Sequence, residues 1–304
     1  MAEVALATCP RCGAPRAVGP DCPKCGVIYA KAHDPRAPRD VPPDPDANVS
    51  TTTWAGDLED ARLEHNLRLF AVPVALLLAH LVVATQLGRA LTRIFLSMLV
   101  HETGHAVTAW LCGYMAFPTL WVTPRSSARI PFLVVILSLA LALGTALLWR
   151  VGRRWTAAGL GALLGLQLFL TLGLSAPRAE ALIAFGGDAG CFVLGAALMC
   201  TFYANSESNL VRGWLRWGFL VIGAFAFSSA LATWWAARTD FDAIPFGEIE
   251  GVGLSDPSRL TETYGWTTHQ LIHRYLAIAG VSFAILTAFY LRGLRARRIQ
   301  STDA

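Results

Sequence analysis

Seven apolar stretches, each near the length of about 20 residues that crosses a bilayer as a helix, dominate the chain. They are expected at 67–86, 91–114, 130–149, 156–175, 180–203, 214–237 and 269–291. Only 15% of the residues are charged, against about 25% in ordinary soluble domains. The sequence therefore predicts an all-α polytopic transmembrane helical bundle of about six to eight spans, occupying residues 61–304.

The positions of the arginines restrict which side of the membrane each loop can occupy. Residues 1–8 lack the basic and apolar regions of a signal peptide, so we expect a cytosolic N-terminus and an integral protein of a bacterial inner membrane. Arginine-rich loops favour the cytosol, yet seven spans place both "RVGRR" at 150–154 and "RGLRARR" at 292–298 outside. Either one stretch is a re-entrant segment or half-helix, or a further span exists.

The first 30 residues contain four of the seven cysteines, in two C-P-x-C-G repeats. The paired cysteines are Cys9, Cys12, Cys22 and Cys25. A glycine after the second cysteine permits a tight turn, and four thiolates complete a tetrahedral structural Zn²⁺ site. The pattern resembles the short zinc ribbons of many bacterial proteins, and metal binding would drive folding of so small a module. Two redox C-x-x-C pairs without metal are the alternative.

This module is expected to bind a protein partner, because four thiolates leave no open coordination position for catalysis. Residues 31–60 are rich in Pro and Asp with little to bury, which is typical of a disordered linker. The small net charge of +4 is spread along the chain and argues against nucleic acid as a partner.

One apolar stretch contains "HETGH", in which His101 and His105 stand one helical turn apart. Both imidazoles leave the same helix face and can bind one Zn²⁺ ion, with Glu102 beside them to hold and deprotonate a metal-bound water. Ionisable groups at membrane depth are costly and are usually functional. The alternative is that both histidines form hydrogen bonds to backbone carbonyls or a buried acid, without metal.

The longer string, with Ala106, Ala109 and Gly113, resembles the H-E-x-G-H-A-x-x-A-x-x-x-G pattern of site-2 proteases, which are intramembrane zinc metalloproteases. The resemblance implies His101 and His105 as zinc ligands, Glu102 as the catalytic general base, and an aspartate on a later helix as third ligand. Asp188 in "FGGDAG" is the candidate, with Glu180 as its replacement. The flanking glycines are expected to let this helix approach a neighbour closely.

The Asp188 helix departs from the family pattern in sequence and direction. The family motif is Leu-Asp-Gly, whereas this chain has Gly-Gly-Asp. Two spans are expected between the histidine helix and the Asp188 helix, which makes them antiparallel, while the family helices are parallel. A second pair, His269 and His273, could bind metal or substrate, or be interfacial.

A polar interval at 238–267 contains several further acids, among them Asp240, Asp242, Glu248, Glu250 and Asp256. It is expected to be a solvated loop, or a platform over the site. The sequence thus predicts an enzyme, a zinc metalloendopeptidase of site-2 type, that cuts membrane-spanning or membrane-proximal protein substrates. The alternatives are a non-catalytic membrane adaptor or assembly factor that uses its zinc ribbon, and a di-metal membrane oxidoreductase.

Overall fold

The computed structural model of the chain describes residues 8–9, 11–15, 18–29, 55–204, 214–249 and 253–302. The chain divides into two compact units, Met1–Leu58 and Glu59–Ala304. Most of the linker predicted at 31–60 lies outside the described residues. Helix α1 begins at Ala55, within the last residues of this interval.

In the first unit, each cysteine pair lies in a tight turn closed by an isolated antiparallel bridge. The Cys9 N–H donates to the carbonyl of Ala14 at 2.7 Å, and the Cys22 N–H donates to that of Val27 at 2.9 Å. Gly13 and Gly26 follow the second cysteine of each pair with φ of 70° and 68°, a left-handed conformation that glycine adopts without steric cost. The predicted role of these glycines is confirmed.

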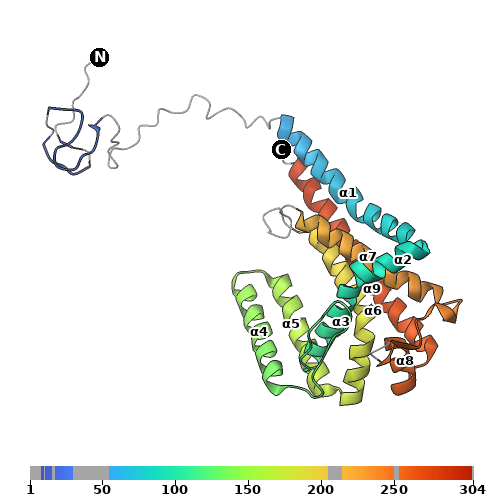
Figure 1. The fold of residues 1–304 in the computed structure, drawn as a ribbon. Helices are drawn as coiled ribbons and strands as arrows, with labels where there is room; N and C mark the ends of the chain where they lie inside the picture. The colour runs from blue at the N-terminus through green and yellow to red at the C-terminus, as the bar shows by residue number, and fades with distance from the viewer. Residues whose placement is uncertain are drawn as a thin grey trace. The chain divides into compact units, whose positions relative to one another are not determined.

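The second unit consists almost entirely of helices, and the only strands among its described residues form one short hairpin (Figure 1). In chain order its elements are α1 (Ala55–Ala84), α2 (Gln86–Thr92), the π-helix η2 (Arg93–Ser97), α3 (Met98–Leu111), α4 (Pro131–Arg150), α5 (Arg154–Leu168), the π-helix η3 (Phe169–Gly173), α6 (Ala176–Cys200), η4 (Thr201–Tyr203), α7 (Leu215–Ala236), η5 (Phe241–Ala243), β1 (Glu248–Ile249), β2 (Gly253–Leu254), α8 (Asp256–Ser258), the π-helix η6 (Arg259–Thr263) and α9 (Thr268–Thr302).

Six helices of the described chain are long and apolar enough to cross a membrane. They cover 62–84, 131–150, 154–173, 176–203, 215–236 and 268–295, so six of the seven predicted spans correspond to such a helix. The stretch at 91–114 is not among them: its residues lie in the continuous helical run of α2, η2 and α3, which contains Arg93, His101, Glu102 and His105.

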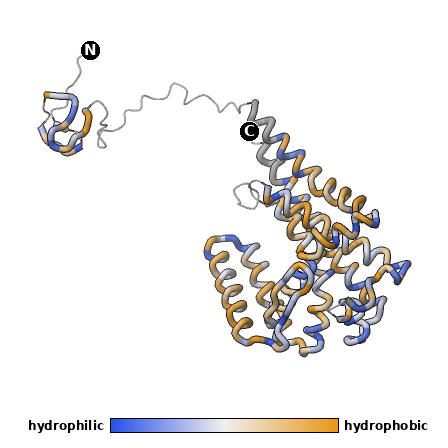
Figure 2. The backbone as a smooth tube through the Cα atoms, in the orientation of Figure 1, coloured by the Kyte–Doolittle hydropathy of each residue, from blue (hydrophilic) through white to orange (hydrophobic). Residues whose placement is uncertain are grey.

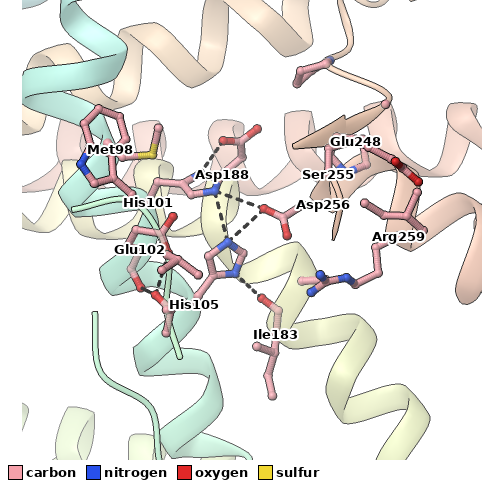
Figure 3. Close-up of a pocket in the computed structure, with 18 of the residues that line it drawn as sticks. Met98, His101, Glu102, His105, Ile183, Asp188, Glu248, Ser255, Asp256 and Arg259 are labelled. Carbon is pink, nitrogen blue, oxygen red and sulfur yellow. Dashed lines mark hydrogen bonds and ion pairs between the residues drawn. The ribbon is translucent and has the colours of Figure 1, made fainter. Parts of the chain in front are cut away.

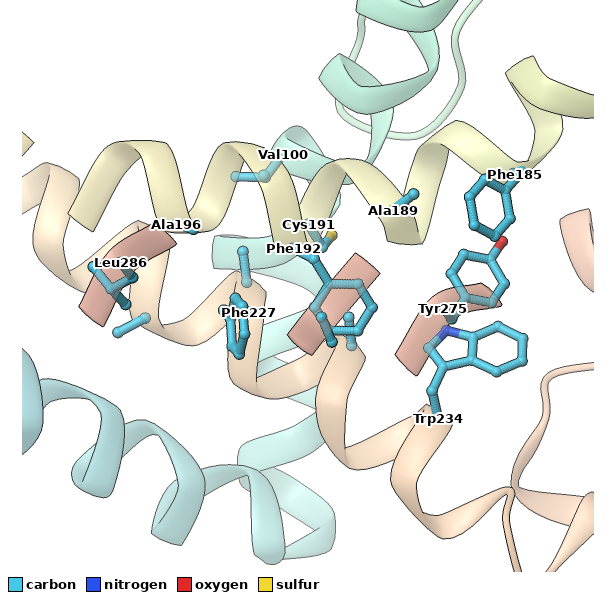
Figure 4. Close-up of a cluster of buried hydrophobic side chains, with 14 of the residues drawn as sticks. Val100, Phe185, Ala189, Cys191, Phe192, Ala196, Phe227, Trp234, Tyr275 and Leu286 are labelled. Atoms are coloured by element: carbon cyan, nitrogen blue, oxygen red, sulfur yellow. The ribbon is translucent and has the colours of Figure 1, made fainter. Parts of the chain in front are cut away.

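Helix α6 is the most buried of the six, whereas α4 contributes no buried residue. The α4–α5 hairpin is mostly apolar along both helices, with its most hydrophilic segment at the turn (Figure 2). Beside α6, the ring of Tyr275 stacks on Phe185 at 4.3 Å and on Trp234 at 4.0 Å between ring centres (Figure 4). This aromatic stack joins α6, α7 and α9, and its Trp234 also contacts Asp188 of α6.

Candidate metal centre

Helices α3 and α6 cross at very short distance and run antiparallel. Ser97 at the end of η2 and His101 and His105 of α3 contact Cys191, Asp188 and Ile183 of α6, in opposite chain order. A Cβ added to Gly104 would lie 2.8 Å from the Cα of Gly190, so no larger residue fits here. The sequence-based expectations of an antiparallel pair and of close approach through glycines are both confirmed.

The glycine beside Asp188 also makes room for the two histidine rings. A Cβ on Gly187 would lie 2.5 Å from His101 Cε1 and 2.5 Å from His105 Nε2. The rings themselves meet edge to face, with their centres 4.7 Å apart. Because Gly187 has no side chain, both imidazoles can point into the same space between α3 and α6.

Each histidine uses Nδ1 for a contact inside the protein. His101 Nδ1 lies 2.9 Å from Asp188 Oδ1, and His105 Nδ1 lies 2.7 Å from the carbonyl oxygen of Ile183. Since a carbonyl and a carboxylate accept hydrogen bonds, Nδ1 donates in both cases, and Nε2 of each neutral ring carries a lone pair. Metal-binding histidines generally donate their second N–H to a carboxylate or a carbonyl in this way.

The two free nitrogens converge on a carboxylate from the loop after α7 (Figure 3). His101 Nε2 and His105 Nε2 lie 3.1 Å apart, and Asp256 Oδ2 lies 3.2 Å from the first and 3.0 Å from the second. Ligands of a tetrahedral Zn²⁺ with bond lengths of about 2.0–2.1 Å would be about 3.3–3.4 Å apart. The three atoms therefore fit one face of such a coordination shell.

Glu102 lies beside these nitrogens. Its carboxylate and the nitrogens of His101 and His105 lie within 4.8 Å of one another, a group that could hold a metal ion. The Thr123 hydroxyl lies 2.7 Å from Glu102 Oε2 and donates a hydrogen bond to it. Glu102 is thus oriented by a residue of the segment between α3 and α4, on the side of the histidines opposite to Asp256 (Figure 3).

Asp188, the predicted third ligand, lies next to His101 but contacts its Nδ1 atom and not the Nε2 atom that Asp256 contacts. One carboxylate oxygen contacts His101 Nδ1, and the other accepts a hydrogen bond of 2.8 Å from Trp234 Nε1. The Arg93 guanidinium lies 3.9 Å from the same carboxylate. Asp188 Oδ1, His101 and Cys191 form a second group within 4.8 Å, to which His105 does not belong.

Asp256 was named from the sequence only as one acid of a polar interval. Asp256 is the first residue of the short helix α8, and Ser255 caps this helix through its hydroxyl. No motif marks Asp256, because only the folded loop brings it to the histidines.

The histidines and Asp256 open into a cavity of about 750 Å³. One wall comes from the segment between α3 and α4, with Trp121 and Thr123, and the facing wall comes from the loop between α7 and α9, with Phe246 and Asp256. The 238–267 interval therefore lies over the site, as one of the two sequence interpretations proposed. Glu250 of this interval lies outside the described residues.

Two further sequence candidates lie apart from the histidine pair. Glu180 accepts a hydrogen bond of 3.0 Å from the Tyr264 hydroxyl and pairs with Arg125 at 3.6 Å. His269 and His273 are exposed, and neither belongs to a possible metal-binding group of the described residues. The ring of His269 instead packs edge to face on Phe241.

The four cysteines of the first unit form a possible metal-binding group of their own. Cys9 Sγ and Cys25 Sγ lie 3.8 Å apart, and Cys12 Sγ and Cys22 Sγ lie 3.7 Å apart. Zinc–sulfur bonds of about 2.3 Å predict about 3.8 Å between thiolates of one tetrahedron. Desolvation opposes ionisation of Cys22, but backbone hydrogen bonds from Lys24 and Cys25 outweigh it and lower the pKa of this thiol to about 6.

Comparisons of the chain with models of known families, with curated proteins and with solved structures found no match. The arguments about function therefore rest on the geometry of the two cysteine pairs and of the histidine centre.

Proposed function

We propose that the chain is an intramembrane zinc metalloprotease of the site-2 type, which hydrolyses peptide bonds of membrane-spanning or membrane-proximal proteins. The observation that carries this proposal is the convergence of His101 Nε2, His105 Nε2 and Asp256 Oδ2 within 3.2 Å of one another, with Glu102 beside them. Two imidazoles and one carboxylate are a common set of protein ligands at a catalytic zinc site, where the fourth coordination position stays open for water or substrate.

The chemistry of these atoms favours a cation between them. Two nitrogen lone pairs and a carboxylate oxygen repel one another at this distance unless a positive charge lies between them. Zn²⁺ suits imidazole and carboxylate ligands, and three protein ligands leave the fourth position for a water or substrate. We therefore assign Asp256, rather than Asp188, as the third ligand, and assign Asp188 the role of orienting His101.

The bound metal would lower the pKa of its water and polarise the peptide carbonyl. Glu102 lies where it can accept the proton of that water and pass it to the leaving amine. The hydrogen bond from Thr123 keeps one Glu102 oxygen engaged and leaves the other for the proton transfer. Asp188 holds the His101 ring in the tautomer that leaves Nε2 free, while Trp234 fixes Asp188 from behind.

The cavity also fits a peptide substrate. Its volume of about 750 Å³ lies within the usual range of ligand sites, about 300–1,000 Å³. Met98, Trp121 and Phe246 give it an apolar lining, which suits a segment taken from a membrane helix. Because helical backbone groups are engaged in hydrogen bonds, the substrate would have to unwind locally before its carbonyl reaches the metal.

The direct test is a Glu102→Gln substitution, which removes the proton acceptor but keeps the shape of the side chain. We expect it to reduce cleavage of a co-expressed model membrane substrate by at least about a hundredfold. Expression and zinc content should stay near wild type, because Glu102 is not a ligand in this assignment. Full cleavage by the variant would exclude the mechanism.

A second candidate function rests on the cysteine module. Its sulfur distances fit a closed structural zinc site, a kind of module suited to binding a protein partner. In this alternative the chain is a membrane adaptor, and the histidine centre holds a structural ion or none. The metal measurements described in the Discussion and the Glu102→Gln assay distinguish the two functions.

A further inference from the structure

Three arginines line the cavity, and they differ in their partners. Arg93 lies 3.9 Å from the Asp188 carboxylate, and Arg125 lies 3.6 Å from that of Glu180. The third is Arg259, whose side chain makes no ion pair or hydrogen bond with any residue of the described ranges. A guanidinium carries five N–H donors and remains charged at all relevant pH values. Within the described part of the chain, Arg259 thus has an unpaired guanidinium that faces the cavity.

Arg259 lies three residues after Asp256, and the backbone between them is helical. It begins the π-helix η6 directly after α8, whose first residue is Asp256. The Arg259 N–H donates to the Ser255 carbonyl at 2.8 Å, and the next residue, Leu260, is fully buried. Arg259 therefore shares a fixed backbone with Asp256, on the side of the histidines opposite to Glu102 (Figure 3).

Among the residues that the structure describes, no acid forms an ion pair with this arginine. Glu248 lines the same wall of the cavity, but its side chain is exposed and forms no ion pair with Arg259. The other acids of the cavity are already engaged: Asp188 and Asp256 contact the histidines, Glu180 contacts Arg125, and Glu102 accepts from Thr123. An anionic group on the substrate would give the Arg259 guanidinium an ion-pair partner.

We propose that Arg259 binds the carboxylate side chain of a substrate residue next to the scissile bond, so that the enzyme prefers an Asp or Glu there. The inference rests on the proposed protease function. Arginine and carboxylate match as a bidentate pair, and a partly enclosed cavity screens the pair less than open solvent does. The apolar lining would accept the other side chains, so the preferred site is one acidic residue within an apolar segment.

The test compares two substrates that differ only in charge. In purified enzyme reconstituted in vesicles, a model membrane substrate is made with Glu or with Gln at each position flanking the mapped cleavage site. Hydrogen bonds to charged groups predict a kcat/KM about tenfold to a hundredfold higher for the Glu substrate at one of these positions. Arg259→Gln should bring this ratio close to one, and Arg259→Glu should favour a substrate with Lys at that position.

Arg153→Gln provides the matched control, because Arg153 lies in the exposed turn between α4 and α5 and does not line the cavity. This variant should keep the wild-type ratio. An unchanged ratio in Arg259→Gln would overturn the inference. An equal loss for both substrates would also overturn it, because Arg259 would then serve folding or the reaction rather than recognition.

Binding separates this inference from the proposed function. If the wild type cleaves neither substrate, the protease proposal fails, while the affinity of zinc-loaded Glu102→Gln for fluorescent Glu and Gln peptides still reports on Arg259. We expect the Glu peptide to bind about tenfold more tightly and the difference to vanish in Glu102→Gln/Arg259→Gln. Equal binding of both peptides would reject the role of Arg259.

Discussion

At the level of single residues, the two aspartates of the centre have separate tasks. Asp188 contacts the inner nitrogen of one histidine, while Asp256 contacts the outer nitrogens of both. Trp234 and Arg93 also lie at Asp188, so its carboxylate is shared among several donors. The other oxygen of Asp256 has no such partner among the described residues. This difference is why we assign the ligand role to Asp256.

Metal content tests this assignment. We expect two zinc ions per wild-type chain, and one after replacement of the four cysteines or after Asp256→Ala. Asp188→Asn keeps the proposed ligands but loses the carboxylate that orients His101, which typically weakens metal binding about 10–100-fold. During dialysis against increasing chelator concentrations, Asp256→Ala should lose the second zinc first, Asp188→Asn should lose it next, and the wild type should lose it last.

Asp242→Asn is the control, because Asp242 is exposed and lies in the same interval as Asp256. It should retain both ions. A chain that loses its second zinc with Asp188→Ala but keeps it with Asp256→Ala would reverse the two roles. A wild-type chain with one ion, lost only with the cysteines, would favour the adaptor.

The sequence predicted part of this centre for a clear physical reason. The i, i+4 spacing places His101 and His105 on one helix face wherever the helix lies, and Asp188 is conspicuous because a lone acid in an apolar stretch needs a partner. Asp256 lies in a polar interval where acids are common and have no periodicity. Its meeting with the histidines depends on the fold of the α7–α9 loop, which no local pattern encodes.

At the level of elements, the centre depends on two helices that meet without side chains between them. Gly104 of α3 faces Gly186 and Gly190 of α6, so the two backbones come into direct contact. In a bilayer, lipid tails solvate apolar side chains as well as a neighbouring helix does, and association relies on such close packing. The distance between the histidines and Asp188 therefore follows from these glycines.

Gly104→Ala should damage the centre without touching a ligand. Its methyl group would meet backbone atoms of α6, which cannot move aside as a side chain can, and overpacking typically costs about 1–3 kcal/mol. We expect a lower thermal unfolding midpoint in detergent together with loss of zinc from the membrane unit.

Gly159→Ala is the matched control for this substitution. Gly159 lies in α5, and a Cβ there meets no atom within 4 Å. Alanine is favoured over glycine inside a helix by about 1 kcal/mol, so this variant should be as stable as wild type or slightly more stable, with full zinc. If Gly104→Ala behaved in the same way, the α3–α6 contact would not determine the geometry of the centre.

At the level of the whole molecule, six crossings would resolve the conflict raised by the arginines. The sequence indicated seven apolar stretches, and an odd number of spans separates the two ends of the chain. We propose that the six long helices cross the membrane and that the run from α2 to α3, which carries the histidines, does not. Six crossings would return the chain to the side from which it started. The turn at 150–154 would then also lie on that side, and with a cytosolic N-terminus both arginine-rich segments would satisfy the positive-inside rule.

This topology predicts where inserted epitope tags are digested in sealed vesicles. Tags at the N-terminus, in the 151–153 turn and after residue 302 should be cleaved by added protease from one and the same side. A tag in the exposed segment at 240–242, which follows five crossings, should be cleaved only from the other side and serves as the control for vesicle sealing. Protection of one terminal tag while the other is digested would mean that the helical segment at 86–111 crosses the membrane as a seventh span. The cavity would then open on the same face of the membrane as the N-terminus, whereas six crossings place its opening on the opposite face.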